Sequence, residues 1–276
     1  MDQFSNHVMA KLDSDTPIYR YINVNKLESI IKDEVIPLSL IASWPDIHEG
    51  LYFQYFSDRI SQKNDRKLPK LDCIFGSSWT LENLTSVIYS NETNEFQIKA
   101  LESIELNGTA TMWDAYCPSG GARIKTTIGK LEQLLINNTE LEFAHGCVGY
   151  SPEAQPVGLA TGELLKNLFV KQISFFHENE YRFIAYFRHG KTKEAISLKV
   201  EDLGDFFDEI LIFPNKHENN TGSDSYKKAK ELHELCYPLI HNSQLAKELN
   251  PTINNKNGKL FCRISQIYNH ISANIG

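Results

Sequence analysis

The chain has few cysteines, and they are not arranged to bind metal or to form a disulfide framework. Its 276 residues include five cysteines at scattered positions, without a CxxC motif. An odd and unclustered set argues against a disulfide-stapled secreted domain and against a cysteine-based zinc site. HExxH and similar histidine spacings are missing too, as is the GxSxG motif of serine hydrolases. We therefore expect reduced thiols, no metal and a cytoplasmic location.

Long apolar runs and an excess of positive charge are also missing. No apolar stretch reaches the roughly 18 residues expected of a transmembrane helix, so no membrane association is predicted. The amino-terminal segment has no basic region followed by an apolar one, so no signal peptide is expected. The net charge of -7 argues against a protein that coats nucleic acid by bulk electrostatics, although a local basic groove stays open.

The composition that is present, 41% hydrophobic and 23% charged, is typical of a globular protein. We expect a single domain over residues 1–276, with a core at 18–213 and a C-terminal helix at 226–247. Short runs rich in β-branched and aromatic residues predict strands at 18–22, 36–41, 72–80, 122–127, 147–150, 174–188, 195–200, 209–213 and 261–267. Helical patterns occupy 26–32, 51–63, 92–104, 111–116, 128–136, 162–169 and 226–247. Together they predict an α+β fold with a mixed or antiparallel central sheet and flanking helices.

The segment 174–188 is the most informative part of the chain. If it is one strand, Glu178, Glu180 and Arg182 point to the same face. Neighbouring carboxylates repel each other and are costly to desolvate unless a nearby cation neutralises them. The interpretation without a functional role is a solvated edge strand with salt bridges. The functional one is a carboxylate at the lip of a cleft, able to accept a hydrogen bond from a sugar or to stabilise positive charge.

The strand at 18–22 contains an arginine, Arg20, preceded and followed by tyrosines. Its planar guanidinium suits a phosphate or carboxylate, and Tyr21 lies beside it. The alternative is an arginine on the exposed side of an edge strand, or one that pairs with an acid for structural reasons.

Two further segments combine aromatic rings with small or polar groups. Ser77, Ser78 and Trp79 could hydrogen-bond a ligand and stack on a flat ring, or could simply end a strand with a core tryptophan. Trp113 and Tyr116 stand three residues apart on a predicted helix face, a pattern found more often in cores than in ligand sites. Gly120-Gly121 lacks the spacing of known phosphate-binding loops.

Taken in order, these short motifs resemble a bacterial family, domain of unknown function 2971. The resemblance covers residues 18–267 and rests on Tyr19-Arg20-Tyr21, Trp44-Pro45-Asp46-x-x-Glu49-Gly50, Phe75-Gly76-Ser77-Ser78-Trp79, Met112-Trp113-x-x-Tyr116, Gly121-x-Arg123-Ile124, Val148-x-Tyr150, Lys171-x-x-x-Phe175-x-x-Glu178-x-Glu180-Tyr181-Arg182, the segment 209–214 and Arg263-Ile264-Ser265. Where this chain has Trp44-Pro45-Asp46, the family more usually has Asn-Asp-Pro, which leaves the role of this loop open.

More weakly, the chain resembles ADP-ribosyltransferase-like domains, which have an Arg or His on the first strand, a hydroxyl or aromatic residue on a middle strand and a Glu on a later strand. This resemblance implies an ADP-ribosyltransferase-like fold and NAD as substrate. It also implies Glu180 as catalytic acid, with Glu178 beside it. The residues implied to bind or orient the dinucleotide are Arg20, Tyr21, Ser77, Ser78, Trp79, Trp113, Tyr116, Lys171 and Arg182. Since likeness of fold does not establish activity, these roles are expectations.

The implied reaction breaks the nicotinamide–ribose bond, and the acceptor could be nucleic acid, protein or a small molecule. Such an enzyme fits a bacterial toxin or an antiphage-defence effector, with an antitoxin or defence partner as a candidate binder. One alternative is a sensor module that binds a nucleotide or phage component without turnover. A weaker alternative is a nuclease that holds a metal with Glu178, Glu180 and Asp114.

Overall fold

The computed structural model describes residues 7–8, 12–46, 49–64, 70–82, 104–151, 161–188, 195–213, 231, 234, 236 and 261–264. The chain divides into two compact units, and each unit is built from three separate stretches of sequence. The first unit takes Met1–Thr16, Val35–Leu81 and Thr127–Lys199. The second takes Pro17–Glu34, Glu82–Thr126 and Val200–Gly276.

The first unit is centred on a sheet whose strands follow the order β1-β6-β9-β4-β3-β10. These strands are β1 (His7–Val8), β6 (Leu141–Cys147), β9 (Glu180–Phe187), β4 (Phe75–Thr80), β3 (Val35–Leu40) and β10 (Ala195–Lys199). β1 is parallel to β6, and the other pairs are antiparallel. A parallel pair, β7 (Gly149–Ser151) and β8 (Val170–Gln172), stands apart from it.

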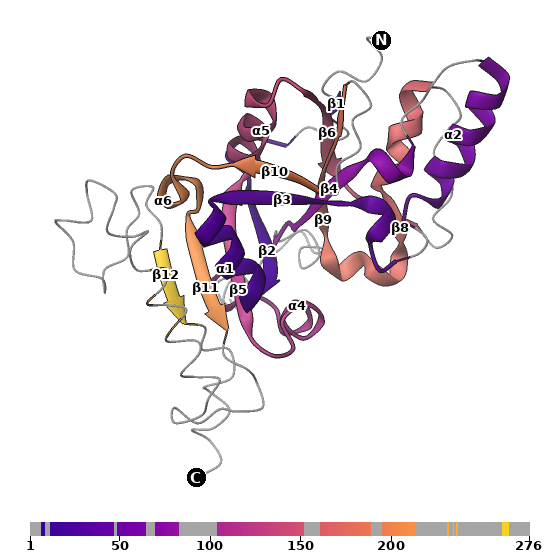
Figure 1. Ribbon diagram of the computed structural model, residues 1–276. Helices are drawn as coiled ribbons and strands as arrows, with labels where there is room; N and C mark the ends of the chain where they lie inside the picture. Colours follow the sequence, from indigo (N-terminus) through magenta and orange to yellow (C-terminus); the bar gives the residue numbers. More distant parts are fainter. Residues whose placement is uncertain are drawn as a thin grey trace. The chain divides into compact units, whose positions relative to one another are not determined.

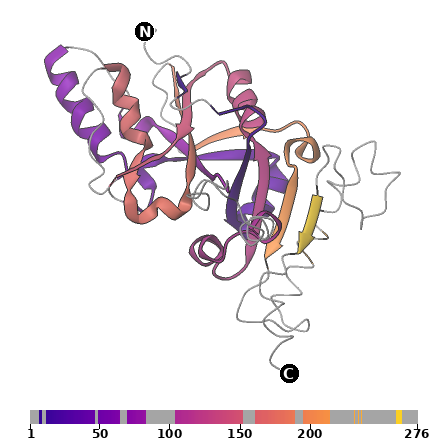
Figure 2. The same cartoon turned by 180° about the vertical axis from the view of Figure 1, so that it is seen from behind.

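The helices of the first unit are α2 (Leu51–Asn64) and α5 (Ile128–Asn137) (Figure 1). The first unit also contains four 3-10 helices: η1 (Ile41–Ser43), η2 (Leu71–Cys73), η4 (Thr161–Phe169) and η5 (Ile173–Glu178). α2 and η4 lie side by side in both views (Figures 1 and 2).

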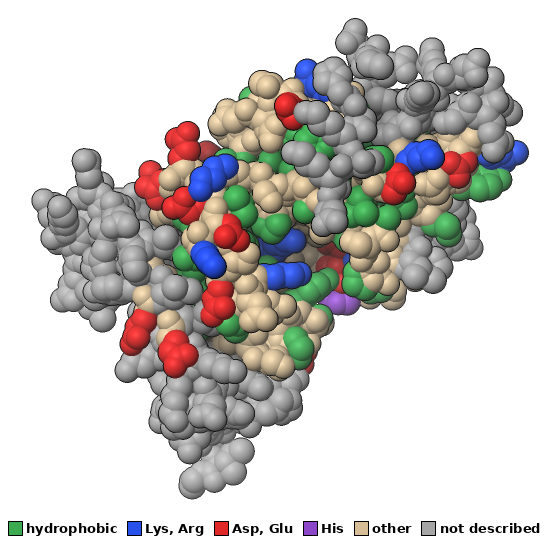
Figure 3. All heavy atoms as spheres, viewed as in Figure 1, with side chains coloured by type: hydrophobic (Ala, Val, Ile, Leu, Met, Phe, Trp, Pro, Cys, Tyr) green, Lys and Arg blue, Asp and Glu red, His purple; other side chains and the backbone are tan. Residues whose placement is uncertain are grey.

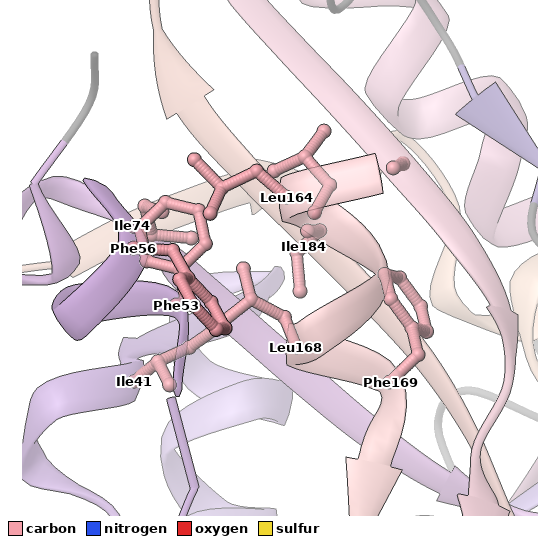
Figure 4. Packing of buried hydrophobic residues seen from close by; sticks show 10 residues of the cluster. Ile41, Phe53, Phe56, Ile74, Leu164, Leu168, Phe169 and Ile184 are labelled. Carbon is pink, nitrogen blue, oxygen red and sulfur yellow. The ribbon is translucent and has the colours of Figure 1, made fainter. Parts of the chain in front are cut away.

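An apolar core joins α2 and η4 to the sheet. Its side chains interdigitate in Figure 4, and they are Ile41, Phe53, Phe56, Ile74, Ala144, Leu164, Leu165, Leu168, Phe169 and Ile184. Ile184 and Arg182 are two residues apart on β9, so they point to the same face of the sheet. The charged end of that face therefore adjoins a layer of buried apolar side chains.

The second unit contains β2 (Pro17–Asn23), β5 (Gly121–Thr127), β11 (Glu209–Phe213) and β12 (Phe261–Ile264), neighbours in that order. β11 is antiparallel to β5 and parallel to β12. Its helices are α1 (Val24–Asp33), α4 (Ala110–Tyr116) and α6 (Leu203–Phe206). The start of α1 was predictable, because the Asn23 side chain accepts a hydrogen bond from the Lys26 N–H at 3.0 Å.

Aromatic packing forms the core of the second unit. Trp113 is stacked on Phe213 at 4.5 Å between centroids and meets the edge of Tyr21 at 4.7 Å. Gly121 lies so close to other groups that a Cβ there would be 2.3 Å from the Ile22 carbonyl oxygen and 2.8 Å from the Cys117 sulfur. A side chain at this position is therefore excluded by the backbone itself.

The predicted α+β class is confirmed, and of the predicted mixed or antiparallel sheets the structure has a mostly antiparallel one. Most predicted elements occur within a few residues of their expected places. The predicted helix at 162–169 is present as the 3-10 helix Thr161–Phe169. One prediction is wrong in kind: only 180–187 of the segment 174–188 is a strand. The predicted helices at 92–104 and 226–247 fall outside the described residues, apart from helical residues 104, 231, 234 and 236.

Within the described ranges, no helix combines the length and apolar character needed to cross a membrane. On the face seen in Figure 3, acidic and basic side chains are interspersed over the coloured surface. Cys73, Cys117, Cys147 and Cys236 carry free thiols.

Candidate functional site

A left-handed residue breaks the segment 174–188 in two. Asn179 has φ 42° and ψ 59°, and it lies between η5 and the first residue of β9, Glu180. Asparagine enters this backbone region more readily than most residues. The Asn179 N–H donates to the Phe176 carbonyl at 3.1 Å, which closes the turn. Glu178 therefore lies outside the strand, and the turn, not β-alternation, brings it to the same place as Glu180.

Lys171, on β8, is the centre of a buried cluster of charged groups. Its Nζ lies 2.7 Å from Glu178 Oε2, 2.7 Å from Glu180 Oε1 and 3.1 Å from Glu49 Oε1. The lysine and all three carboxylates are more than nine-tenths buried. Since an ammonium group has three donors, these three acids use its full capacity.

Arg182 is the second cation of the cluster. Its Nη2 lies 2.7 Å from Glu180 Oε2 and 3.2 Å from Glu49 Oε1, and its Nη1 donates to the Leu168 carbonyl. The guanidinium carbon is 4.8 Å from the centre of the Trp44 ring, an arrangement that favours the cation. Arg182 is therefore fixed on several sides, as its 1% exposure requires.

Glu180 is the most firmly held acid. Its Oε1 accepts from Lys171, while its Oε2 accepts from Arg182 and, at 2.8 Å, from the Ser78 hydroxyl. Its backbone N–H donates to the Tyr150 hydroxyl at 2.8 Å. Ser78 and Tyr150 are both partly exposed, so two of the residues that contact the buried Glu180 also reach the surface.

The two neighbouring acids titrate in opposite directions. Burial raises the pKa of Glu178 to about 7, helped by its hydrogen bond to Glu180 and the nearby Glu180 charge, and opposed by Lys171. Burial would also raise the pKa of Glu180, but Arg182, the hydrogen bond from Glu178 and Lys171 together hold it below its usual range. At neutral pH Glu180 is therefore ionised, while Glu178 is close to half-protonated.

This division balances the charge of the cluster. Three carboxylates face two cations, so the fully ionised cluster carries one excess negative charge. A proton on Glu178 cancels that charge. Burial alone would lower the pKa of Lys171, but Glu180 and Glu49 outweigh it, so Lys171 remains an ammonium ion.

The structure brings one of the three predicted residues of β4 to this cluster. The strand register places Ser78 opposite Arg182 and Trp79 opposite Tyr181. Ser77 and Trp79 therefore lie on the other face of the sheet, where the Trp79 Nε1 donates to the Ser77 hydroxyl at 3.0 Å. Trp79 is 1% exposed and has the place of a core tryptophan.

The other predicted residues belong to the second unit. Burial lowers the pKa of Arg20 to about 10, and Tyr116 opposes this shift. Trp113 is fully buried, whereas Tyr116 is 41% exposed, so the two do not present one aromatic surface. The Tyr21 hydroxyl donates to Glu82 and accepts from the Thr109 N–H at 3.1 Å.

The second unit has a buried ion cluster of its own, which the sequence did not reveal. Arg123 pairs with Glu82 and, at 2.8 Å, with Glu209, and it donates to the carbonyls of Ile104 and Glu105. Burial raises the pKa of Glu82 to about 7, although Arg123 and Tyr21 oppose the shift. Arg123 thus fastens segments that are far apart in the sequence.

Two residues of the first cluster were missed as site residues: Glu49 and Tyr150. Both occur in the short motifs of the sequence, Trp44-Pro45-Asp46-x-x-Glu49-Gly50 and Val148-x-Tyr150. Nothing else in either motif distinguishes these two residues as members of a buried cluster. Among the residues that the structure describes, no group of three His, Cys, Asp or Glu side chains is arranged to hold a metal ion. Asp114 belongs to the second unit, whereas Glu178 and Glu180 belong to the first.

The chain matches no protein-family model and no curated protein. Its cluster therefore has to be interpreted from its own chemistry.

Proposed function

We propose that the protein is an ADP-ribosyltransferase-like enzyme, with a fold of that type, which breaks the nicotinamide–ribose bond of NAD. The observation that carries this proposal is the division between Glu178 and Glu180. Both carboxyl groups lie 2.7 Å from Lys171 Nζ, and their surroundings drive their pKa values in opposite directions, a pattern found in acid/base pairs with separate roles.

In this reaction the C1′–N bond breaks and its electron pair leaves with nicotinamide. The ribose carbon becomes a cation like that of glycoside hydrolysis. Glu180, kept ionised by Arg182 and Lys171, is the group proposed to stabilise that cation. Its fixed position means that no reorganisation is needed when the charge develops.

Glu178 is proposed to take the proton of the acceptor as the acceptor attacks C1′. A general base works best with a pKa near the operating pH, and about 7 meets that condition. We propose nucleic acid, protein or a small molecule as the acceptor, and a role as a bacterial toxin or antiphage-defence effector.

The test is incubation of the full chain with NAD labelled in the nicotinamide ring, followed by measurement of released nicotinamide. The wild type should release label, and Glu180→Gln should lower the rate about 100-fold or more. Glu142→Gln is the matched control, because Glu142 lies on the neighbouring strand β6 and accepts from Tyr186 instead. A folded wild-type protein that neither binds nor consumes NAD would refute the proposal.

One observation favours a second function, a binding module without turnover. Both oxygens of Glu180 already accept hydrogen bonds from Lys171, Arg182 and Ser78. A carboxylate so fully engaged can hold a binding surface in shape without reacting. A ligand-dependent rise in melting temperature with intact ligand recovered afterwards would support this function instead.

A further inference from the structure

Two polar atoms of the first cluster are buried without a hydrogen-bond partner among the described residues. They are Glu49 Oε2 and Arg182 Nε. Glu49 is 7% exposed and Arg182 is 1% exposed. Folded proteins leave few buried polar groups unsatisfied, and each of them calls for an explanation.

The two atoms belong to side chains that already touch. Arg182 Nη2 lies 3.2 Å from Glu49 Oε1. In a two-pronged arginine–carboxylate pair, a second bond would join the other nitrogen to the other oxygen. Here only one prong is made, so the pair retains one open donor, Nε–H, and one open acceptor, Oε2.

Glu49 is held in place by its surroundings. Its backbone N–H donates to the Asp46 carbonyl at 3.1 Å. The next residue, Gly50, has φ +78°, and a Cβ there would be 2.6 Å from a Leu71 methyl carbon. Only glycine fits this position without strain. The open oxygen therefore belongs to a residue that stands between a backbone hydrogen bond to Asp46 and a left-handed glycine.

We propose that Glu49 and Arg182 bind a neutral carboxamide group. Its NH2 donates to Glu49 Oε2, and its carbonyl oxygen accepts from Arg182 Nε–H, which satisfies both open atoms. A carboxylate in the same place has no proton to donate and would add to the negative charge of Glu49, Glu178 and Glu180. The site thus distinguishes an amide from the corresponding acid.

This inference rests on the proposed function in one respect, since nicotinamide is the carboxamide that the proposed reaction releases. Its recognition by Glu49 would place the leaving group at the cluster that contains Glu180. The pairing itself depends only on the chemistry of the two open atoms.

The test measures binding of nicotinamide and of nicotinic acid to the full chain by calorimetry, with no NAD present. Nicotinamide should bind at least tenfold more tightly than nicotinic acid. Glu49→Gln replaces one acceptor oxygen by a donor NH2 group. It should therefore weaken nicotinamide binding at least tenfold and reduce the difference in affinity between nicotinamide and nicotinic acid. Glu142→Gln should change neither affinity.

Equal affinities for the two ligands, or binding of neither, would overturn the inference. So would a folded Glu49→Gln protein that binds nicotinamide as the wild type does. If that variant does not fold, the wild-type comparison of the two ligands still decides. Selective nicotinamide binding without NAD cleavage would refute the proposed function alone, whereas NAD cleavage without selectivity would refute this inference alone.

Discussion

Asn179 makes hydrogen bonds to both the N–H and the carbonyl of Leu81. The Leu81 N–H donates to the Asn179 carbonyl at 2.8 Å, and the Asn179 side-chain amide donates to the Leu81 carbonyl. Since Asn179 separates Glu178 from Glu180, one residue both turns the chain between the two acids and secures the end of β4. The position of the acid pair therefore depends on a residue that carries no charge.

Substitutions at Asn179 should separate these two contributions. Asn179→Gly and Asn179→Ala both remove the side-chain hydrogen bond, but only alanine is strained at φ 42°. We expect Asn179→Ala to be less stable than Asn179→Gly by about 1 kcal/mol. Urea unfolding of the two variants measures the difference. A glycine variant less stable than the alanine variant would contradict the left-handed conformation.

Lys171→Met should be one of the most destabilising single changes in the first unit. It leaves three buried carboxylates with Arg182 as their remaining cation, and breaking a buried ion pair from one side costs about 3–5 kcal/mol. Lys125→Met is the control, because Lys125 is partly exposed and lies 3.7 Å from Glu105. That change should cost less than about 1 kcal/mol. Equal losses in chemical denaturation would show that the cluster around Lys171 is not buried.

Stability should fall between about pH 5 and pH 8 because of Glu178. Its pKa rises from 4.5 to about 7 on folding, so the folded state binds its proton more tightly. That contribution is complete below pH 4.5 and is lost as pH rises through about 7. A single group of this kind changes the free energy of unfolding by at most about 1.4 kcal/mol per pH unit.

Glu178→Gln should reduce the fall in the free energy of unfolding between pH 5 and pH 8. Glu82→Gln should have the same effect through the second unit, because the pKa of Glu82 is also raised to about 7. The measurement is the free energy of unfolding of each variant at several pH values. Glu180→Gln should act at the opposite end, since the lowered pKa of Glu180 supplies stability that disappears as pH falls below its ordinary pKa. A profile that is unchanged in all three variants would contradict these assignments.

The proposed role of Glu178 as a base makes a kinetic prediction. The rate of nicotinamide release should rise with pH through about 7, because only ionised Glu178 can accept the proton. Glu178→Gln should lower the rate and remove this rise. If the variant keeps the rise, another group is the base.

Gly121→Ala should destabilise the second unit by about 2 kcal/mol or more, because its Cβ would meet the Ile22 carbonyl oxygen at 2.3 Å. Gly149 provides the comparison, since the nearest atom to a Cβ there is 3.8 Å away. Gly149→Ala should therefore be close to neutral. Thermal unfolding of both variants distinguishes a steric effect from a general cost of replacing glycine.

Local sequence signals were enough to predict most strands and helices. A short apolar run with two isoleucines marked 209–213, and Asn23 marked the start of α1. They were not enough at 174–188, because a 3-10 helix that ends at the left-handed residue Asn179 occupies the first part of a segment with strand composition. Propensity averaged over a window does not register one such residue.

The candidate site was predictable in part. Glu178, Glu180, Arg182 and Lys171 were expected together, because buried carboxylates require cations, and the structure brings them together. Glu49 could not be predicted, since it is more than 100 residues away in sequence from Lys171 and Arg182. Ser77 and Trp79 were expected beside Ser78, but strand alternation sends neighbouring residues to opposite faces.

The interleaved division of the chain has a consequence for its synthesis on the ribosome. β2 and β5 emerge long before β11, yet β11 pairs with β5 and provides Glu209 for Arg123. The first unit has all its stretches once Lys199 has been made, whereas the second then still lacks β11 and β12. A nascent chain halted after Lys199 would therefore expose the open edge of β5 and leave Arg123 without one of its two acids, a state open to aggregation or to capture by a chaperone.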